Sequence, residues 1–159
     1  MKVGITGHTK GLGKSLYNNI LSRKHEVLGF SRSNGFDIKN PYQRGSIVQA
    51  VRQFDAFINL VHNYYHQSDL LIELHKSWRG LDKKIINISS GVVSNDTWAL
   101  DNYEMMEYKI QKINLESMSI HLNKIDVKPK IITYIISDID LEHDTNKILQ
   151  LLDEKTHKE

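Results

Sequence analysis

A short β-branched segment that runs directly into three closely spaced glycines is the feature that most restricts how this chain can fold. Residues Lys2–Thr6 read as a buried strand, and the loop Gly7–Gly13 (GHTKGLG) leads into apolar residues at helical spacing, Leu16 and Ile20. Glycines between a strand and a helix permit a tight turn, a close approach of the backbone to phosphates, and close helix–strand packing. The pattern predicts the first βα unit of a dinucleotide-binding fold.

The rest of the chain alternates between strand-like and helix-like segments. Further strands are expected at Glu26–Ser31, Gly35–Ile38 (very short), Asp55–Val61, Lys84–Ser89 and Pro129–Ile136. Helices are expected at Gly13–Arg23, from Pro41 through Val51, and at Ser68–Trp78, Asn102–Leu122 and Thr145–Leu152. Apolar strands separated by helices predict an α/β fold. We expect a doubly wound, Rossmann-type parallel sheet of about six strands, in a single three-layer domain that spans residues 1–159.

Composition narrows the function classes. The 159 residues are 40% hydrophobic and 25% charged, with a formal net charge of +2, which is typical of a globular domain and gives no reason to expect nucleic acid or membrane partners. The absence of cysteine excludes disulfides and thiol chemistry, and the scattered histidines predict no metal site. Because Met1 and Lys2 lead directly into a strand, with no long apolar stretch, we expect a cytoplasmic protein.

The residues after the second strand indicate which dinucleotide is bound. A protein that prefers NAD usually carries an acid here, about 20 residues after the glycine loop, whereas this chain has Ser31, Arg32 and Ser33. An arginine can bind the 2′-phosphate of NADP through paired hydrogen bonds, and Lys10 adds a second positive charge. The sequence therefore favours NADP (NADPH) over NAD, with the alternative that both cations are ordinary solvated side chains.

Four blocks in this order resemble the short-chain dehydrogenase/reductase (SDR) family. They are TGHTKGLG at 6–13, Phe36-Asp37-Ile38, DAFINLVH at 55–62, and INISS at 86–90 followed by YKIQK at 108–112. The resemblance implies that Asp37 contacts the adenine and that Lys112 also holds the nicotinamide ribose. The loop and the resemblance together assign cofactor binding to Gly7, Thr9, Lys10, Gly11, Leu12, Gly13, Ser31, Arg32, Ser33, Asp37, Asn59, Tyr108 and Lys112.

The candidate catalytic residues are Ser90, Tyr108 and Lys112. Tyr108 and Lys112 lie four residues apart on an expected helix and so share a face. A lysine ammonium favours the phenolate form of a neighbouring phenol, which otherwise titrates at about pH 10. Ser90 ends a strand and can hydrogen-bond a substrate carbonyl. Tyr103 is a competitor for the acid/base role, because it follows Ser90 at a spacing closer to that of the family, but its fourth successor is Glu107 instead of lysine.

The chain also departs from the family. It is shorter than typical members, Asn63 matches the family's proton-relay asparagine by spacing only, and His62, Tyr64, Tyr65 and Trp98 are candidates to line a shallow substrate pocket. The resemblance implies a homodimer built from the helices 68–78 and 102–122, with apolar area from Met105, Met106, Ile110, Ile113 and Met118. Two functions follow from the sequence, an NADP-dependent oxidoreductase acting on a small carbonyl or alcohol and a non-catalytic NADP-binding regulatory module. A sugar-nucleotide epimerase would need more chain.

Overall fold

Five parallel strands form the centre of the fold in the computed structural model, which describes residues 1–95, 102–138 and 140–154. The strands are β1 (Lys2–Thr6), β2 (Glu26–Phe30), β3 (Ala56–Asn59), β4 (Lys84–Ser90) and β5 (Lys130–Ile136). Their order across the sheet is β2-β1-β3-β4-β5. The predicted Rossmann-type α/β fold is confirmed.

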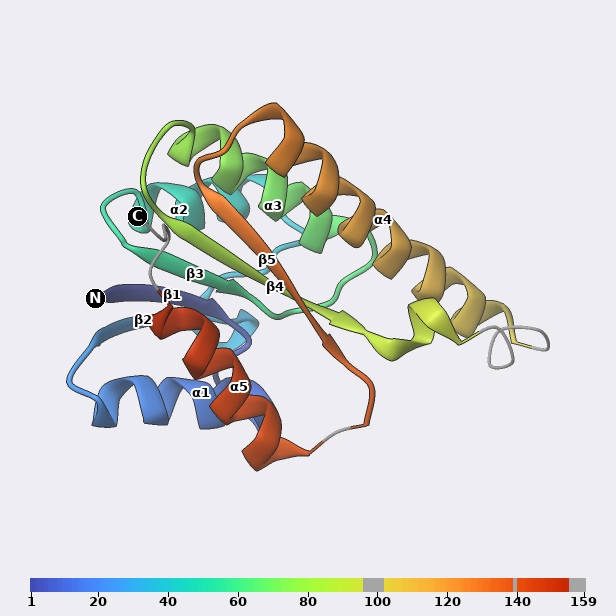
Figure 1. The fold of residues 1–159 in the computed structure, drawn as a ribbon, viewed down its shortest axis with the longest axis horizontal. Helices are drawn as coiled ribbons and strands as arrows, with labels where there is room; N and C mark the ends of the chain where they lie inside the picture. The colour runs from blue at the N-terminus through green and yellow to red at the C-terminus, as the bar shows by residue number, and fades with distance from the viewer. Residues whose placement is uncertain (96–101, 139, 155–159) are drawn as a thin grey trace.

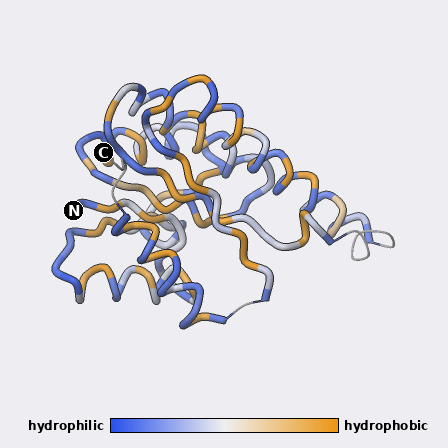
Figure 2. The backbone as a smooth tube through the Cα atoms, in the orientation of Figure 1, coloured by the Kyte–Doolittle hydropathy of each residue, from blue (hydrophilic) through white to orange (hydrophobic). Residues whose placement is uncertain are grey.

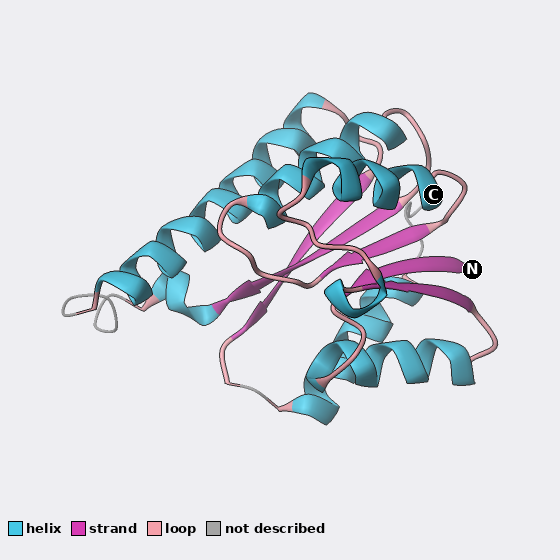
Figure 3. Ribbon diagram, turned by 180° about the vertical axis from the view of Figure 1, so that it is seen from behind, coloured by secondary structure: helices cyan, strands magenta, loops and turns pink. Residues whose placement is uncertain are grey.

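Helices cover both faces of this sheet (Figure 1). The α-helices are α1 (Gly11–Ser22), α2 (Pro41–Ala50), α3 (His66–Trp78), α4 (Tyr103–Ile125) and α5 (Leu141–Asp153), and short 3-10 helices span Arg32–Asn34 and Gly91–Ser94. α1 and α5 pack together on one face, and α2, α3 and α4 lie on the other, as the view from behind also shows (Figure 3). None of the helices in these described ranges is long and apolar enough to cross a bilayer.

Two apolar clusters, one on each face of the sheet, make up the core. The cluster beneath α2, α3 and α4 includes Phe57, Leu71 and Trp78, all fully buried. The cluster beneath α1 and α5 includes Ile58 and Ile148. The neighbours Phe57 and Ile58 point to opposite faces, as strand geometry requires, which is why the strands read as continuous apolar runs in the sequence (Figure 2).

The very short strand expected at Gly35–Ile38 is a turn instead. Gly35 has a left-handed backbone with φ of 89°, and the Phe36 amide donates to the Ser31 carbonyl at 2.9 Å. The Asn34 side chain binds the Gly29 carbonyl and the Ser31 amide, which closes the turn immediately after β2. Phe36 packs edge-on against Phe30, with ring centroids 5.0 Å apart. The segment is therefore folded back over β2 and cannot extend the sheet.

The position of β1 creates a crevice at one edge of the sheet. β1 lies between β2 and β3, so the connections that leave β1 and β3 depart toward opposite faces. Ligands of open α/β sheets bind at such a reversal point, outside the carboxyl ends of the strands. The glycine loop, the turn after β2 and the segment after β3 all lie at this edge.

Candidate functional site

The glycine loop brings the start of α1 very close to the end of β1. Gly7 has a φ of 75°, and its amide donates to the Phe30 carbonyl at 2.8 Å. A Cβ added to Gly13 would lie 2.0 Å from the Gly7 carbonyl oxygen, so only glycine fits there. The close contact directs the beginning of α1 at the crevice, as the sequence predicts.

The first turn of α1 has no side-chain cap. Lys10 occupies the N-cap position without capping, and no acid lies in the first turn. By contrast, Asn40 caps α2 and Asn102 caps α4 with side-chain oxygens. The free amides of α1 and its positive dipole end suit a pyrophosphate.

A cavity of about 1070 Å³ lies in front of this helix end. Its walls come from the loops after β1, β2 and β3: Thr6, Gly7, Thr9, Lys10, Phe30, Ser31, Arg32, Ser33, Phe36, Asp37, Ile38, Leu60, Val61, His62 and Asn63. Seven of the predicted cofactor-binding residues are on that list: Gly7, Thr9, Lys10, Ser31, Arg32, Ser33 and Asp37. Gly11, Leu12 and Gly13 form the helix start beside it. Drug-sized ligands occupy roughly 300–1,000 Å³, so the space suits a dinucleotide.

Positive charge lines the same cavity. Arg32 and Lys10 are both exposed and both line it, and neither forms an ion pair with a carboxylate in the described part of the chain. Around Arg32 the backbone is fixed by the Ser31–Asn34 capping box, and the Ser31 and Ser33 hydroxyls lie 2.8 Å apart. Two unneutralised cations beside free amides give this wall of the cavity a preference for anions.

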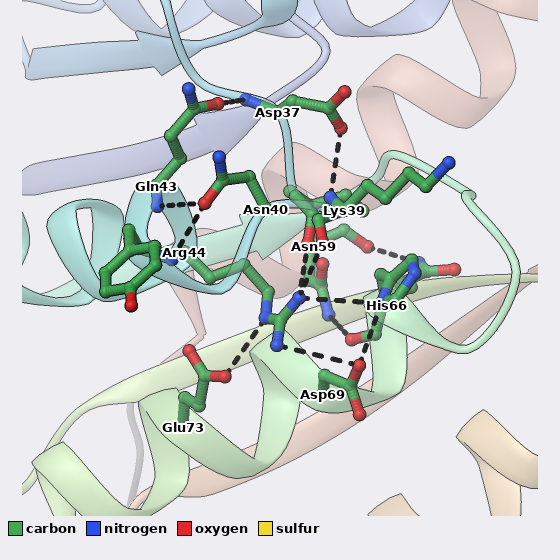
Figure 4. A network of polar contacts seen from close by, with 12 residues as sticks. Asp37, Lys39, Asn40, Gln43, Arg44, Asn59, His66, Asp69 and Glu73 are labelled. Carbon is green, nitrogen blue, oxygen red and sulfur yellow. Dashed lines mark hydrogen bonds and ion pairs between the residues drawn. The ribbon is translucent and has the colours of Figure 1, made fainter.

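A buried arginine anchors the segment that brings Asp37 and Ile38 into the cavity lining. Arg44, on α2, is 8% exposed; its Nη1 donates to the Ile38 carbonyl at 2.7 Å and its Nε to Glu73 of α3 at 3.0 Å. Asp37 is fixed from the same side, since its amide donates to Gln43 and its carboxylate accepts from the Lys39 amide (Figure 4). This network ties the loop that carries Asp37 to two helices.

Asn59 does not line the cavity. It is fully buried at the end of β3, and its Nδ2 donates to Asn87 Oδ1 at 3.0 Å and to the Gln67 carbonyl at 2.9 Å. Asn87 in turn donates to the Ser119 hydroxyl of α4. Since β3 is flanked by β1 and β4, its last side chain is enclosed by neighbouring elements, and Asn59 joins the sheet to α3 and α4.

Lys112 belongs to the same buried network. Its Nζ donates to Gln67 Oε1 at 2.9 Å and to the Ile88 carbonyl at 3.0 Å, and the residue is 3% exposed. Burial lowers the pKa of the Lys112 amine to about 8, an effect that Glu116 partly opposes. Spacing predicts Asn63 as the counterpart of the family's proton-relay asparagine, whereas the side chain that reaches Lys112 from α3 is Gln67. Gln67 directly precedes the helix expected at Ser68–Trp78, and nothing in the residue pattern predicts that its side chain reaches Lys112.

Tyr108 connects the lysine to the cavity. The Lys112 Nζ lies 5.7 Å from the centre of the Tyr108 ring, and the His62 ring packs edge-on against the same phenol with centroids 4.6 Å apart. Burial and the nearby Lys112 charge lower the pKa of His62 to about 4, although a hydrogen bond that the His62 ring donates to Gln111 acts in the opposite direction. His62 is therefore a neutral ring that lies between the cavity and Tyr108.

Ser90 ends β4. Its hydroxyl oxygen accepts a hydrogen bond from the Val92 amide at 3.4 Å, which leaves its own proton free to be donated. No hydrogen bond joins Ser90 to Tyr108 in the described part of the structure. The neighbouring Ser89 is buried and donates to Glu116 of α4.

The remaining candidates are placed as follows. Tyr103 begins α4 and is 82% exposed, so it lies outside the network around Lys112. Tyr64 and Tyr65 are also exposed, at 60% and 47%. Asn63 lines the cavity. Trp98 lies outside the described residues.

Comparison with known proteins gives a consistent fold but no relative in sequence. No family model matches the chain, and no curated protein matches it. Among solved structures, the chain is similar to a short-chain dehydrogenase from Burkholderia cenocepacia J2315 in complex with NADP, with a TM-score of 0.78 and 15% identity over 96% of this chain and 84% of that one. It is also similar to the 3-alpha-hydroxysteroid dehydrogenase from Pseudomonas sp. B-0831 complexed with NADH, with a TM-score of 0.75 and 16% identity over 96% of this chain and 88% of that one.

A third similar structure is the bulky-bulky ketone specific alcohol dehydrogenase from Comamonas testosteroni, with a TM-score of 0.72 and 15% identity, covering 96% of this chain and 82% of that chain. At these identities the likeness is one of fold. The chain therefore has the fold of the short-chain dehydrogenase/reductases, as its glycine loop and its paired Tyr108 and Lys112 predicted.

Proposed function

We propose that this chain is an NADP(H)-dependent oxidoreductase of the SDR type, which moves a hydride between the cofactor and a small carbonyl or alcohol with Tyr108 as acid and base. One observation carries the proposal: the cavity that begins at the glycine loop ends at His62, and His62 lies against Tyr108, with Lys112 on the same phenol. Phosphate-binding features and a proton-transfer pair thus lie at one edge of the sheet. The similar structures bound to NADP and NADH support a nicotinamide cofactor.

Different residues around the cavity would bind different parts of NADP. The free amides of α1 would bind the pyrophosphate, and Arg32 with Lys10 would bind a 2′-phosphate. Asp37, held by the loop that Arg44 anchors, would contact the adenine. When bound, the nicotinamide ring supplies or accepts the hydride.

The proton chemistry would come from the chain itself. Tyr108 would donate its phenolic proton to the carbonyl oxygen during reduction and regain it in the reverse reaction. The Ser90 hydroxyl, whose proton is free, would hydrogen-bond the same oxygen. Lys112 is cationic below about pH 8 and would stabilise the phenolate that forms. An ammonium has three donors and two are used by Gln67 and Ile88, so one remains for a ribose hydroxyl or a water.

A second candidate function, a non-catalytic NADP-binding module, is favoured by a different observation. Ser90, Tyr108 and Lys112 do not line the cavity, and Lys112 is enclosed by its two acceptors. A regulatory protein needs the cofactor cavity but not an accessible phenol.

The homodimer and the cytoplasmic location stay predictions. For a dimer through α3 and α4, Met106, Ile110 and Ile113 are exposed, whereas Met118 packs on the core.

Calorimetric titration with NADPH and NADH, followed by a screen for NADPH consumption with small aldehydes and ketones, tests both candidates. Tighter binding of NADPH with turnover of a carbonyl supports the enzyme. Tight binding of NADPH without turnover of any carbonyl supports the regulatory module. Failure to bind either cofactor contradicts both.

A further inference from the structure

β5 is an edge strand with hydrogen-bonding groups directed away from the sheet. It is last in the order β2-β1-β3-β4-β5 and pairs only with β4 in the ranges described. The Lys130 amide donates to the Lys83 carbonyl, so Lys130 directs its backbone toward β4. Because successive residues of a strand alternate in direction, Ile131, Thr133 and Ile135 direct their N–H and C=O groups to the open side.

One of these three residues is already covered. The Asn123 side chain of α4 donates to the Ile131 carbonyl at 2.8 Å and accepts from the Ile131 amide at 3.1 Å. A primary amide that satisfies both groups of one residue does what a neighbouring strand would do there. No described side chain does the same for Thr133 or Ile135, and Ile135 is 48% exposed.

The covered residue restricts how a second β5 strand can pair with this edge. In an antiparallel pair centred on Tyr134, Thr133 of each copy stands opposite Ile135 of the other copy, and each such pair exchanges two hydrogen bonds. A pair centred on Thr133 would place Ile135 opposite the covered Ile131. Only the register centred on Tyr134 pairs the two open residues with each other.

Charge favours the same register. A basic residue, Lys130, begins the strand, and an acidic residue, Asp138, follows it. Centred on Tyr134, an antiparallel pair places Lys130 of each copy opposite Asp138 of the other, whereas a parallel pair would align like charges. Opposite charges on facing strands stabilise a sheet and like charges destabilise it.

We propose that this chain dimerises by antiparallel pairing of β5 with β5 of a second copy, about a two-fold axis that passes beside Tyr134. The two sheets then form one continuous sheet. Pairing would also cover an apolar strand edge, and exposed edges of this kind promote aggregation. This surface is separate from a contact through α3 and α4, and it does not depend on the proposed oxidoreductase activity.

Single introduced thiols test the register, because the natural chain has no cysteine. Residues that face each other without exchanging hydrogen bonds have Cα atoms about 4.5 Å apart, within the range for a disulfide. Tyr134→Cys should therefore form a covalent dimer on mild oxidation. The matched control Thr133→Cys should stay monomeric under denaturing conditions, since position 133 faces position 135 and not itself. Circular dichroism checks that both variants fold, because Tyr134 donates to Asp144 in the natural chain.

Charge reversal supplies a second test that leaves Tyr134 in place. Lys130→Asp should weaken dimerisation roughly tenfold in sedimentation equilibrium, because two attractive pairs become repulsive. The double variant Lys130→Asp with Asp138→Lys should restore the dimer. A chain that is monomeric at high micromolar concentration overturns the proposal. So does a dimer that neither cross-links through position 134 nor responds to the charge reversal.

Discussion

Gln67 on α3 accepts a hydrogen bond from the amine of Lys112 on α4 at 2.9 Å, and both side chains are almost fully buried. The contact places a neutral acceptor, instead of a carboxylate, against the lysine that the proposed chemistry requires as a cation. Burial of Lys112 lowers the pKa of its amine to about 8, and the uncharged Gln67 does not offset this effect. The proposed activity should therefore fall as the pH rises through this value.

Gln67→Glu should move that loss of activity to higher pH. A carboxylate beside the amine favours its charged form and should raise the pKa of Lys112 by about one unit or more. The measurement is the alkaline limb of the pH–rate profile for carbonyl reduction. Gln67→Leu is the control, because it removes the acceptor without adding charge and should not shift the limb upward. If the alkaline limb of the pH–rate profile is unchanged in Gln67→Glu, the protonation state of Lys112 does not affect the rate-limiting step.

Arg32→Ala should weaken NADPH binding much more than NADH binding. The loss of a charged hydrogen bond to the 2′-phosphate costs about 1.5–3 kcal/mol, or roughly ten- to a hundredfold in dissociation constant. Calorimetry with both cofactors measures the difference, and Arg52→Ala, an exposed cation away from the cavity, is the control. Equal losses for the two cofactors would refute the assignment of Arg32.

Tyr108→Phe should lower the rate of carbonyl reduction by about 10²–10⁴-fold, because the acid that protonates the carbonyl oxygen is removed while the ring that packs on His62 remains. The NADPH dissociation constant should change far less than the rate. Tyr103→Phe should keep full activity, because Tyr103 is 82% exposed and lies outside the Lys112 network. If Tyr103→Phe is inactive and Tyr108→Phe is active, the roles are reversed.

His62 makes the free energy of unfolding depend on pH between about 4 and 6.5. Its pKa is about 4 in the folded chain and 6.5 in the unfolded chain, so in this window the unfolded chain binds the extra proton. Stability should consequently fall as the pH drops from 6.5 toward 4. Urea denaturation across this range should give a flatter curve for His62→Gln than for the natural chain. His75, whose pKa is also lowered by burial, contributes equally to both proteins. Curves of equal slope would contradict the prediction.

Arg44→Met should lower the free energy of unfolding by about 1–3 kcal/mol, because the Ile38 carbonyl and Glu73 lose their donor. Arg44→Met should also weaken NADPH binding, because the loop that it no longer anchors contains Asp37, which lines the cavity. Arg52→Met, which removes an exposed cation, should change stability by no more than about 0.5 kcal/mol. Arg44→Met with unchanged NADPH affinity would show that Arg44 only stabilises the fold.

The sequence by itself determined the parts of this protein that depend on short stretches of chain. Apolar runs and helical spacing predicted the strands β1 to β5 and the five α-helices of the described structure, because these patterns reflect which faces a segment buries. The spacing of the glycines predicted the close approach of α1 to the end of β1. The structure has that approach, because there is no space for a side chain at Gly13 next to Gly7. The local pattern wrongly predicted a strand at residues 35–38. The Asn34 side chain and Gly35 form a turn there, which apolar content does not reveal.

Only the tertiary structure decided which distant side chains meet. Gln67 and Lys112 are 45 residues apart, Arg44 and Glu73 are 29 apart, and Asn59 is buried because β3 is enclosed between β1 and β4. The free edge of β5 likewise depends on the order of the whole sheet and on Asn123 reaching Ile131 from α4. A residue's neighbours along the chain determine its local conformation, but the packing of helices on the sheet determines its partners, and spacing in the sequence carries little information about that packing.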